Sequence, residues 1–222
     1  MVFAGTGILI SSMEVLPHED ADFNTWNDVE HMAERVAIPG FLDGRRYASV
    51  DVPTRYLQIY NTADVGVLDG PAYRAALANQ TDWSMHHITR FIGPTRVVGR
   101  LVHTRGSVRG VAVLLLRLRP TGAPAMLPAL AGLLDLLQQP GAGSIHFVEA
   151  EPRLSRPVTA DDSYVGGQDC YVVLECTSVP AAERIVAALP RPAPAYGQLV
   201  SARVYQYRMD VSAAALAASA GA

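Results

Sequence analysis

The clearest potential for chemistry lies in residues 26–41, which read WNDVEHMAERVAIPGF. The imidazole of His31 can accept or release a proton near neutral pH without a cofactor, so His31 is the leading candidate for a general acid or base. Trp26 and Glu30 lie on the same expected helix. The chemistry depends on whether this helix brings Trp26 and His31 into one pocket.

Helical geometry opposes such a pocket unless the helix is irregular. Successive side chains are about 100° apart, so His31 lies about 140° from Trp26 on a straight helix. Trp26 shares the apolar face with Phe23 and Ala33, whereas His31 would face solvent. A bend near Glu30 would bring both rings together. We therefore predict a bent helix with His31 in a cavity, and a surface histidine is the alternative.

Glu30 lies close to the apolar face of the same helix, where a carboxylate needs a partner. Arg45 or Arg46 on the following strand could provide it. Two roles remain open for Glu30, a structural ion pair between helix and sheet or acid-base catalysis.

Polar and aromatic side chains alternate with aliphatic ones along residues 55–61. This period of two places Tyr56, Gln58 and Tyr60 on one sheet face. Tyr47 on the neighbouring strand could join them. Phenols in a cavity can orient a carbonyl or phenolate, and hydrogen-bonded core tyrosines are the alternative.

Trp83, His86 and His87 follow the second expected helix. Adjacent histidines on a helix point about 100° apart, which hinders chelation of one metal ion. The sequence contains no H-x-H, H-x-x-x-H or H-E-x-x-H spacing, so we expect no metal site. His87 could still join a pocket, and a polar helix end is the alternative.

Composition narrows the class of protein. The 222 residues are 50% hydrophobic and 18% charged, with a formal net charge of −3, which disfavours a nucleic-acid partner. We find no apolar run of about 18 residues, so no membrane span is expected. The N-terminal residues lack the basic region of a signal peptide, which predicts a cytoplasmic protein.

Several cofactor chemistries are also disfavoured. All 18 cationic side chains are arginine, so lysine Schiff-base chemistry is excluded. The GTG at residues 5–7 precedes a strand, whereas the dinucleotide fingerprint follows one. Cys170 and Cys176 would lie about 20 Å apart along one strand and are expected to be free thiols.

The apolar patterns predict eight strands and four helices. The strands are expected at residues 7–15, 44–51, 55–61, 95–104, 111–120, 144–152, 169–178 and 199–210, and the helices at 22–37, 70–81, 123–139 and 179–189. Each half of the chain thus has the order β-α-β-β-α-β. Such a unit forms a four-stranded antiparallel sheet with both helices on one face.

We therefore predict an α+β protein made of tandem ferredoxin-like repeats, 1–106 and 107–211, followed by a disordered tail at 212–222. Each unit leaves one apolar sheet face uncovered. Packing the two sheets against each other would give a barrel within one chain, with the helices outside. A polar loop at 159–167 could rim a cavity.

The first half resembles the dimeric α+β barrel superfamily, in a fused two-repeat form close to a bacterial branch of EthD-type proteins. The motifs that carry the resemblance are Trp26-Asn-Asp-Val-Glu30-His31, Ile38-Pro-Gly-Phe41, Arg45-Arg46-Tyr47, Tyr56-Leu-Gln-Ile-Tyr60 and Thr81-Asp-Trp83. Met32 and Ala33 depart from the pattern, since a proline often follows the Glu-His pair. The superfamily includes cofactor-free monooxygenases, muconolactone isomerases, polyketide cyclases and haem enzymes, so the fold does not select the reaction.

The resemblance implies a pocket in the first half, with the second half as its structural partner. We predict a cofactor-independent enzyme of lyase, isomerase, cyclase or oxygenase type that acts on a small hydrophobic or aromatic metabolite. The catalytic candidates are His31, Glu30, Tyr47 and Tyr60, and the substrate-binding candidates are Trp26, Arg46, Tyr56, Trp83 and His87. A homo-oligomer is compatible with this prediction.

Two alternatives remain. The first is a ligand-binding or accessory protein without turnover. The second is a haem protein of the same superfamily, because haem needs a single axial histidine. His31, His103 or His146 could supply that ligand.

Overall fold

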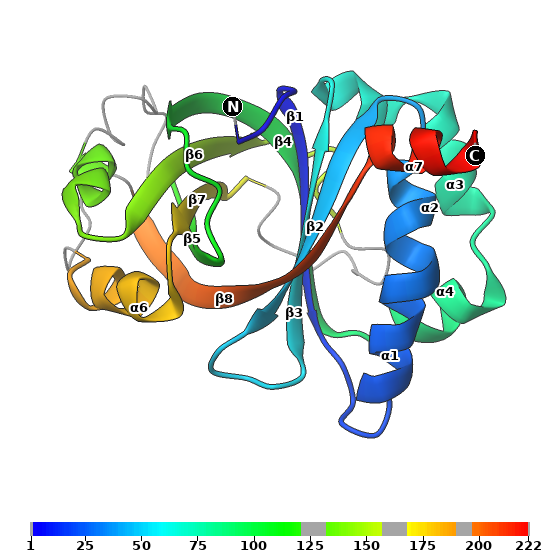
Figure 1. Cartoon of the computed structure of the whole chain (residues 1–222), viewed down its shortest axis with the longest axis horizontal. Coiled ribbons are helices and arrows are strands. Elements are labelled where there is room, and N and C mark those ends of the chain that lie inside the picture. Colours follow the sequence, from blue (N-terminus) through cyan, green and yellow to red (C-terminus); the bar gives the residue numbers. More distant parts are fainter. Residues whose placement is uncertain (1, 121–131, 157–167, 190–196, 222) are drawn as a thin grey trace.

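A closed antiparallel barrel forms the centre of the molecule (Figure 1). The computed structural model describes residues 2–120, 132–156, 168–189 and 197–221. The strands are β1 (Gly7–Glu14), β2 (Phe41–Ser49), β3 (Arg55–Thr62), β4 (Ile92–Gly106), β5 (Ala112–Arg119), β6 (Ala142–Ala150), β7 (Cys170–Cys176) and β8 (Gln198–Ser212). Their order around the barrel is β1-β3-β2-β8-β5-β7-β6-β4. The predicted α+β barrel is therefore confirmed.

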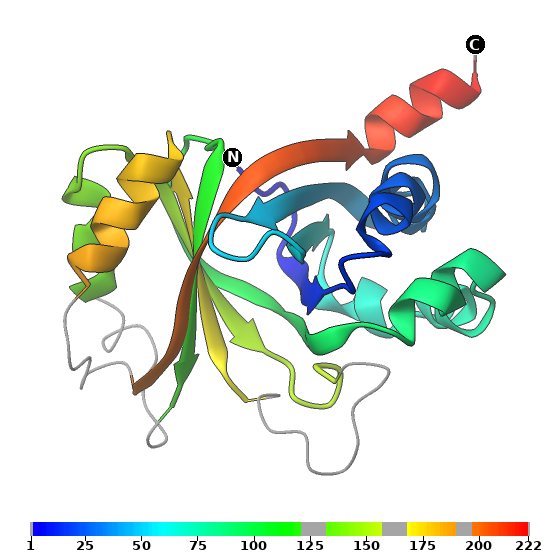
Figure 2. The same cartoon turned by 90° about the horizontal axis from the view of Figure 1, so that it is seen from below.

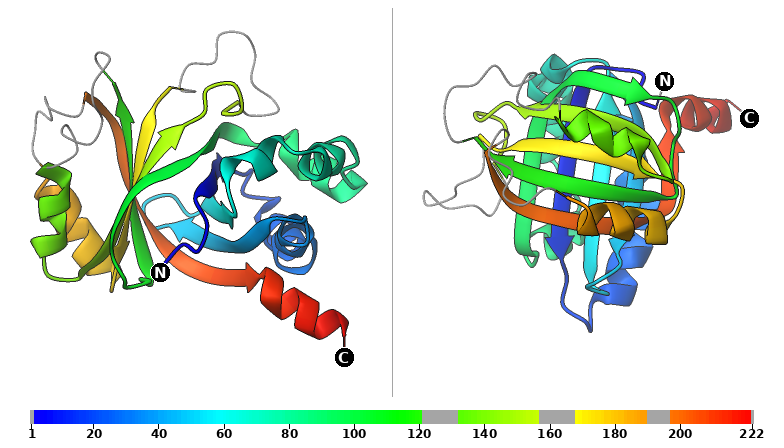
Figure 3. Two further views of the ribbon diagram at one scale, coloured as in Figure 1. Left: turned by 90° about the horizontal axis from the view of Figure 1, so that it is seen from above. Right: turned by 90° about the vertical axis from the view of Figure 1, so that its left-hand side faces the viewer.

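The two longest strands join the halves of the chain. β4 pairs with β1 on one side and with β6 on the other, and β8 pairs with β5 and β2. Both strands curve from one half of the molecule into the other (Figures 2 and 3). The barrel is thus closed by pairing between the N-terminal and C-terminal halves.

Helices cover two opposite sides of the barrel (Figure 1). The first half contributes α1 (Asp20–Trp26), α2 (Met32–Val36), α3 (Pro71–Ala78) and α4 (Asp82–Ile88), with a 3₁₀ turn at Val65–Asp69. The second half contributes α6 (Val179–Ala187), a 3₁₀ turn at Asp135–Gln138 and α7 (Ala213–Ala220). Helices α1 and α2 are joined by a π-helical turn, Asn27–His31, called the π turn below.

The helix expected at 70–81 is α3, Pro71–Ala78, and a separate helix, α4, follows at Asp82–Ile88. The Thr81 hydroxyl accepts a hydrogen bond of 3.0 Å from the backbone N–H of Ser84 and so caps α4. Most of the helix expected at 123–139, and the loop at 159–167, lie outside the described residues.

The prediction of a disordered tail at 212–222 was wrong for residues 213–220, which form α7. The Ser212 side chain caps this helix by accepting a hydrogen bond of 3.2 Å from the backbone N–H of Ala215. Ala213 and Leu216 then pack against the apolar core of the first half. The alanine-rich sequence favours a helix once it has a cap and a surface to pack on.

Two kinds of core lie on the two faces of the sheet. The barrel interior combines apolar residues from both halves, including Ile10, Leu57, Val113 and Val173. The outer face of the first-half strands packs against the helices α1 to α4. Residues with even numbers in β3 therefore face the helices, and the candidate site lies in this second layer.

Candidate functional site

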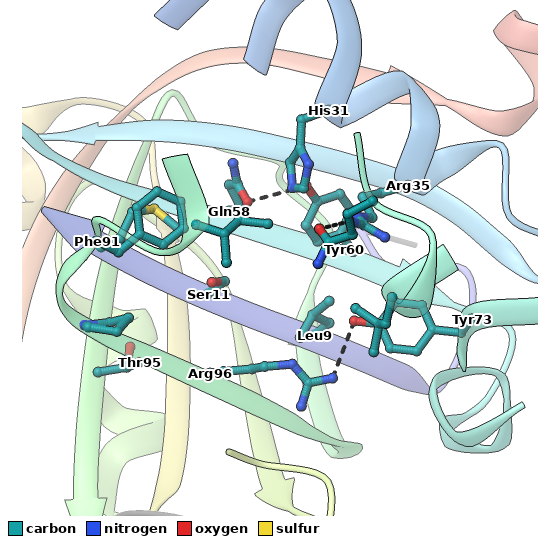
Figure 4. Close-up of a pocket in the computed structure, with 15 residues that line it drawn as sticks. Leu9, Ser11, His31, Arg35, Gln58, Tyr60, Tyr73, Phe91, Thr95 and Arg96 are labelled. Atoms are coloured by element: carbon teal, nitrogen blue, oxygen red, sulfur yellow. Dashed lines mark hydrogen bonds between the residues drawn. The ribbon is translucent and has the colours of Figure 1, made fainter. Parts of the chain in front are cut away.

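A cavity of about 90 Å³ lies between the outer face of β1, β3 and β4 and the helices of the first half (Figure 4). It opens partly to solvent. Its lining combines apolar, aromatic, amide and cationic side chains: Leu9, Ser11, Met13, His31, Arg35, Gln58, Tyr60, Tyr73, Leu77, Gln80, Ile88, Phe91, Pro94, Thr95 and Arg96. The first half thus contains the mostly apolar site with a few convergent polar groups that is typical of small-molecule binding.

The π turn brings His31 to this cavity. A π-helical turn accommodates one more residue than an α-helical turn, so residues five apart lie on the same face. The rings of Trp26 and His31 accordingly stack with centroids 4.2 Å apart. The predicted irregularity around Glu30 and His31 is confirmed.

His31 is almost fully buried, at 8% exposed. Its Nδ1 has no hydrogen-bond partner among the described residues. Burial, and then the positive charges of Arg35 and Arg46, hold the pKa of His31 well below its usual range. The imidazole is therefore neutral at physiological pH, which is the form that a general base needs.

Tyr60 and Gln58 form the sheet side of the cavity. The Tyr60 hydroxyl lies 3.3 Å from Gln58 Oε1 and 3.2 Å from Met32 Sδ, and it can donate its proton to either. The Gln58 amide in turn donates to Asn27 Oδ1 in the π turn. Burial raises the pKa of Tyr60, so its phenol stays protonated and can act as a donor.

Two arginines that were not among the candidates line the cavity. Arg35 donates to Gln80 Oε1 at 2.7 Å, and Arg96 donates to the Tyr73 hydroxyl at 3.2 Å and to the Leu154 carbonyl. The spacing of four residues between His31 and Arg35 places both on one helix face and could have identified Arg35. Arg96 comes from β4, whose contacts with the helices the sequence does not show.

Glu30 has different partners from those expected. Its Oε1 accepts hydrogen bonds from Trp26 Nε1 at 3.2 Å and Thr81 Oγ1 at 2.6 Å. The expected ion pair with Arg45 or Arg46 is wrong, because Arg45 lies inside the barrel and Arg46 pairs with Asp28 at 2.7 Å.

Arg46 and Tyr56 lie in one network beside the cavity and are not part of its lining. The Arg46 guanidinium lies 4.9 Å from the Tyr56 ring centroid. The Tyr56 hydroxyl donates to Asp20 Oδ1 at 2.6 Å and accepts from Asn24. This network connects β2 and β3 to α1.

The structure separates Tyr47 from the other tyrosines. Tyr47 pairs with Leu57 in the β2–β3 ladder and therefore shares its face, inside the barrel. The expectation that Tyr47 joins Tyr56 and Tyr60 was thus wrong about the face of the sheet.

His87 and Trp83 lie on α4, outside the cavity lining. The His87 ring packs against Trp26, with centroids 5.0 Å apart. Trp83 donates to Asp22 at 3.0 Å and is half-buried. Neither residue lines the cavity.

Haem does not fit the candidate histidines. His146 has both ring nitrogens within hydrogen-bond distance of hydroxyls, Ser144 at 2.9 Å and Thr104 at 3.2 Å. The cavity at His31 holds about 90 Å³, whereas pockets for drug-sized ligands measure about 300–1,000 Å³. His103 packs against Phe147, with ring centroids 5.8 Å apart, and does not line the cavity.

No family model matches this sequence, and no curated protein is significantly similar to it. Among the described residues, no helix is both long and apolar enough to cross a membrane.

Solved structures with the same architecture cover almost the whole chain. An anthrone oxidase-like protein superimposes with a TM-score of 0.70 at 13% identity, covering 96% of this chain and 95% of its own. A candidate monooxygenase from Lactobacillus acidophilus has a TM-score of 0.53 at 10% identity, with 94% and 97% covered. A haem-binding protein from Thermus thermophilus has a TM-score of 0.53 at 13% identity, with 98% and 96% covered. At these identities the likeness concerns the fold, and the chain has the dimeric α+β barrel architecture.

Proposed function

We propose that this protein is a cofactor-independent enzyme that removes a proton from a small aromatic substrate in the first-half cavity. The observation that carries the proposal is the buried, neutral His31 imidazole, whose Nδ1 has no hydrogen-bond partner within the described part of the chain. A buried polar atom without a partner is costly in a structure unless it serves a ligand.

The charges around His31 suit the formation of an anion. Proton transfer to His31 creates an imidazolium, which its apolar surroundings alone would disfavour. A substrate anion formed in contact with this ring would offset that cost, and the guanidinium groups of Arg35 and Arg96 would stabilise the anion. The Tyr60 hydroxyl would donate to the same developing oxyanion.

The residues behind the cavity are assigned positioning roles in this proposal. Trp26 stacks on His31 and fixes the plane of its ring, and Glu30 holds the Trp26 indole. Arg46 and Tyr56 hold α1 against the sheet. His87 and Trp83 pack in the same cluster as Trp26 and support it.

The substrate proposed is an aromatic ketone or phenol with one acidic proton. A mostly apolar lining favours a ring, and two cations favour an oxygen that becomes an anion. The anthrone oxidase-like and monooxygenase neighbours support testing an anthrone first, of which about one ring would occupy the cavity of about 90 Å³ while the rest would extend through its opening to solvent. Loss of a proton from its methylene gives an anion that can react with O₂, after which the methylene has become a carbonyl and one water has formed.

The two halves are proposed to be fused ferredoxin-like repeats, with 1–106 carrying the site and 107–211 completing the barrel. The matching order of elements supports this proposal. A cytoplasmic location and a homo-oligomer remain predictions.

The test is a turnover assay with the full chain. Anthrone and a panel of related aromatic ketones and phenols are incubated with the protein, while substrate loss and O₂ consumption are recorded. We expect saturable turnover of at least one compound with an acidic C–H or O–H. Binding without turnover would instead support an accessory protein. If the protein neither bound nor converted any of these compounds, the proposal would be refuted.

A further inference from the structure

A cluster of metal-ligand side chains lies where the start of α1 meets the end of α4, away from the cavity. Glu19 is the N-cap of α1, and His86 and His87 lie in the last turn of α4. One ligand atom from each of these residues lies within 4.8 Å of the other two. The two helices lie side by side on the right of Figure 1.

The separations are close to those around one ion. Zinc binds histidine nitrogen at about 2.0–2.1 Å, so two ligand atoms on one ion can be no more than about 4.2 Å apart. His86 Nε2 lies 3.4 Å from Glu19 Oε1, close to the edge of a tetrahedral site. The two separations to His87 are at most 4.8 Å, so the ligand atoms would have to shift by less than about 1 Å to hold one ion.

His87 provides an independent observation. It is 1% exposed, and its Nδ1 has no hydrogen-bond partner in the ranges that the structure describes. Its Nε2 lies at ion-pair distance from Asp22 Oδ2, 3.0 Å away. A buried imidazole with an unsatisfied nitrogen is costly, and an ion bound to that nitrogen would remove the cost.

The side chains around the cluster favour a bound cation, although Arg90 competes for Glu19. Trp83 Nε1 donates to Asp22 Oδ2 and so orients this carboxylate towards His87. Arg90 Nε lies 3.6 Å from Glu19 Oε1 and would have to move away when an ion binds.

We propose that Glu19, His86 and His87 bind one divalent transition-metal ion such as Zn²⁺. The ion would connect α1 to α4. It would thereby fix His87 against Trp26, which also contacts His31. This proposal does not depend on the function proposed for the cavity.

The test uses the full chain after removal of metal with a chelator. Zn²⁺ is titrated by calorimetry, and Co²⁺ is titrated by its visible absorption. We expect one ion per chain, and we expect Glu19→Gln and His86→Ala each to weaken binding at least about tenfold, since even changes to residues that only orient ligands cost that much. The His86 side chain is exposed and that of Glu19 is mostly buried, so circular dichroism is used to confirm that both variants fold.

His18→Ala is the matched control, because His18 is an exposed histidine next to Glu19 and outside the cluster. Its affinity for Zn²⁺ should equal that of the unmodified protein. Absence of saturable binding would overturn the proposal. Equal affinities for the unmodified protein and the His86→Ala variant, or an equal loss in the His18→Ala variant, would overturn it as well.

Discussion

Glu30 holds α1 to α4 through one carboxylate oxygen, which accepts from Trp26 and from the cap residue Thr81. Removing this acceptor leaves the half-buried Thr81 hydroxyl without its acceptor, while Trp26 Nε1 keeps only Ser84 Oγ at 3.2 Å. An unsatisfied donor of this kind costs about 1–3 kcal/mol. Glu30→Ala should therefore lower the free energy of unfolding by that amount in urea denaturation.

Glu34→Ala is the control for this change, because Glu34 lies on α2 only four residues away and is exposed. Its free energy of unfolding should stay within about 0.5 kcal/mol of the unmodified value. Equal effects of the two substitutions would show that Glu30 has no structural role.

At the scale of the residue, the sequence identified part of the site. His31 and Tyr60 line the cavity as expected. Tyr47 does not, because its face depends on pairing with Leu57, and a slip of one residue would have exchanged the faces. The turn between β2 and β3 sets this register, and the alternation within each strand carries no information about it.

At the scale of the element, the π turn decides where His31 points. Val29 is 66% exposed and is the outward residue of this turn. A π turn corresponds to one residue inserted into an α-helix. Deleting Val29 should therefore let α1 continue into α2 as a regular helix, with the residues corresponding to Trp26 and His31 four apart and still on one face.

We expect the Val29 deletion to fold, with a melting temperature near that of the unmodified protein. Deleting Asn27 is the comparison, since Asn27 is buried and bonds to Gln58 and to the Phe23 carbonyl. That deletion should lower the melting temperature strongly. If both deletions unfolded the protein equally, the π turn would not be a simple insertion.

The irregularity itself was predictable from a conflict, because Trp26 and His31 could not share one face of a straight helix. The form of the irregularity was not predictable, since a kink and a π turn both resolve that conflict.

The cluster of Glu19, His86 and His87 was missed for another reason. Spacing rules examine neighbouring residues, whereas Glu19 reaches His86 and His87 from a helix far away in the sequence.

At the scale of the whole molecule, one buried ion pair connects the two halves inside the barrel. Arg45 on β2 donates to Glu175 on β7 at 2.8 Å, and both side chains are fully buried. Glu175 also accepts from the backbone N–H of Gly110 at 2.9 Å. Burial raises the pKa of Glu175, and the Arg45 charge opposes that shift.

Removing one partner leaves an uncompensated buried charge, which costs about 3–5 kcal/mol. Arg45→Met should therefore destabilise the protein by that amount, and the double variant Arg45→Met with Glu175→Leu should recover most of it. Urea denaturation of Arg45→Met, Glu175→Leu and the double variant measures the coupling free energy between the two side chains. Additive losses would contradict a direct contact between the halves.

The barrel was the most predictable feature, because eight apolar segments in the order found here leave few other ways to cover their surfaces. The pairing of Arg45 with Glu175 was not predictable. The two residues are 130 positions apart and meet only once the barrel has closed.

The central claim is that His31 accepts a proton from an aromatic substrate. The most direct measurement is the rate at which the protein exchanges the acidic C–H of anthrone for deuterium in D₂O, followed by NMR, because this step precedes any oxidation or rearrangement. We predict that His31→Ala lowers the protein-catalysed rate by about two to four powers of ten, while His18→Ala leaves it unchanged. A folded His31→Ala variant that exchanges the proton as fast as the unmodified protein would contradict the account.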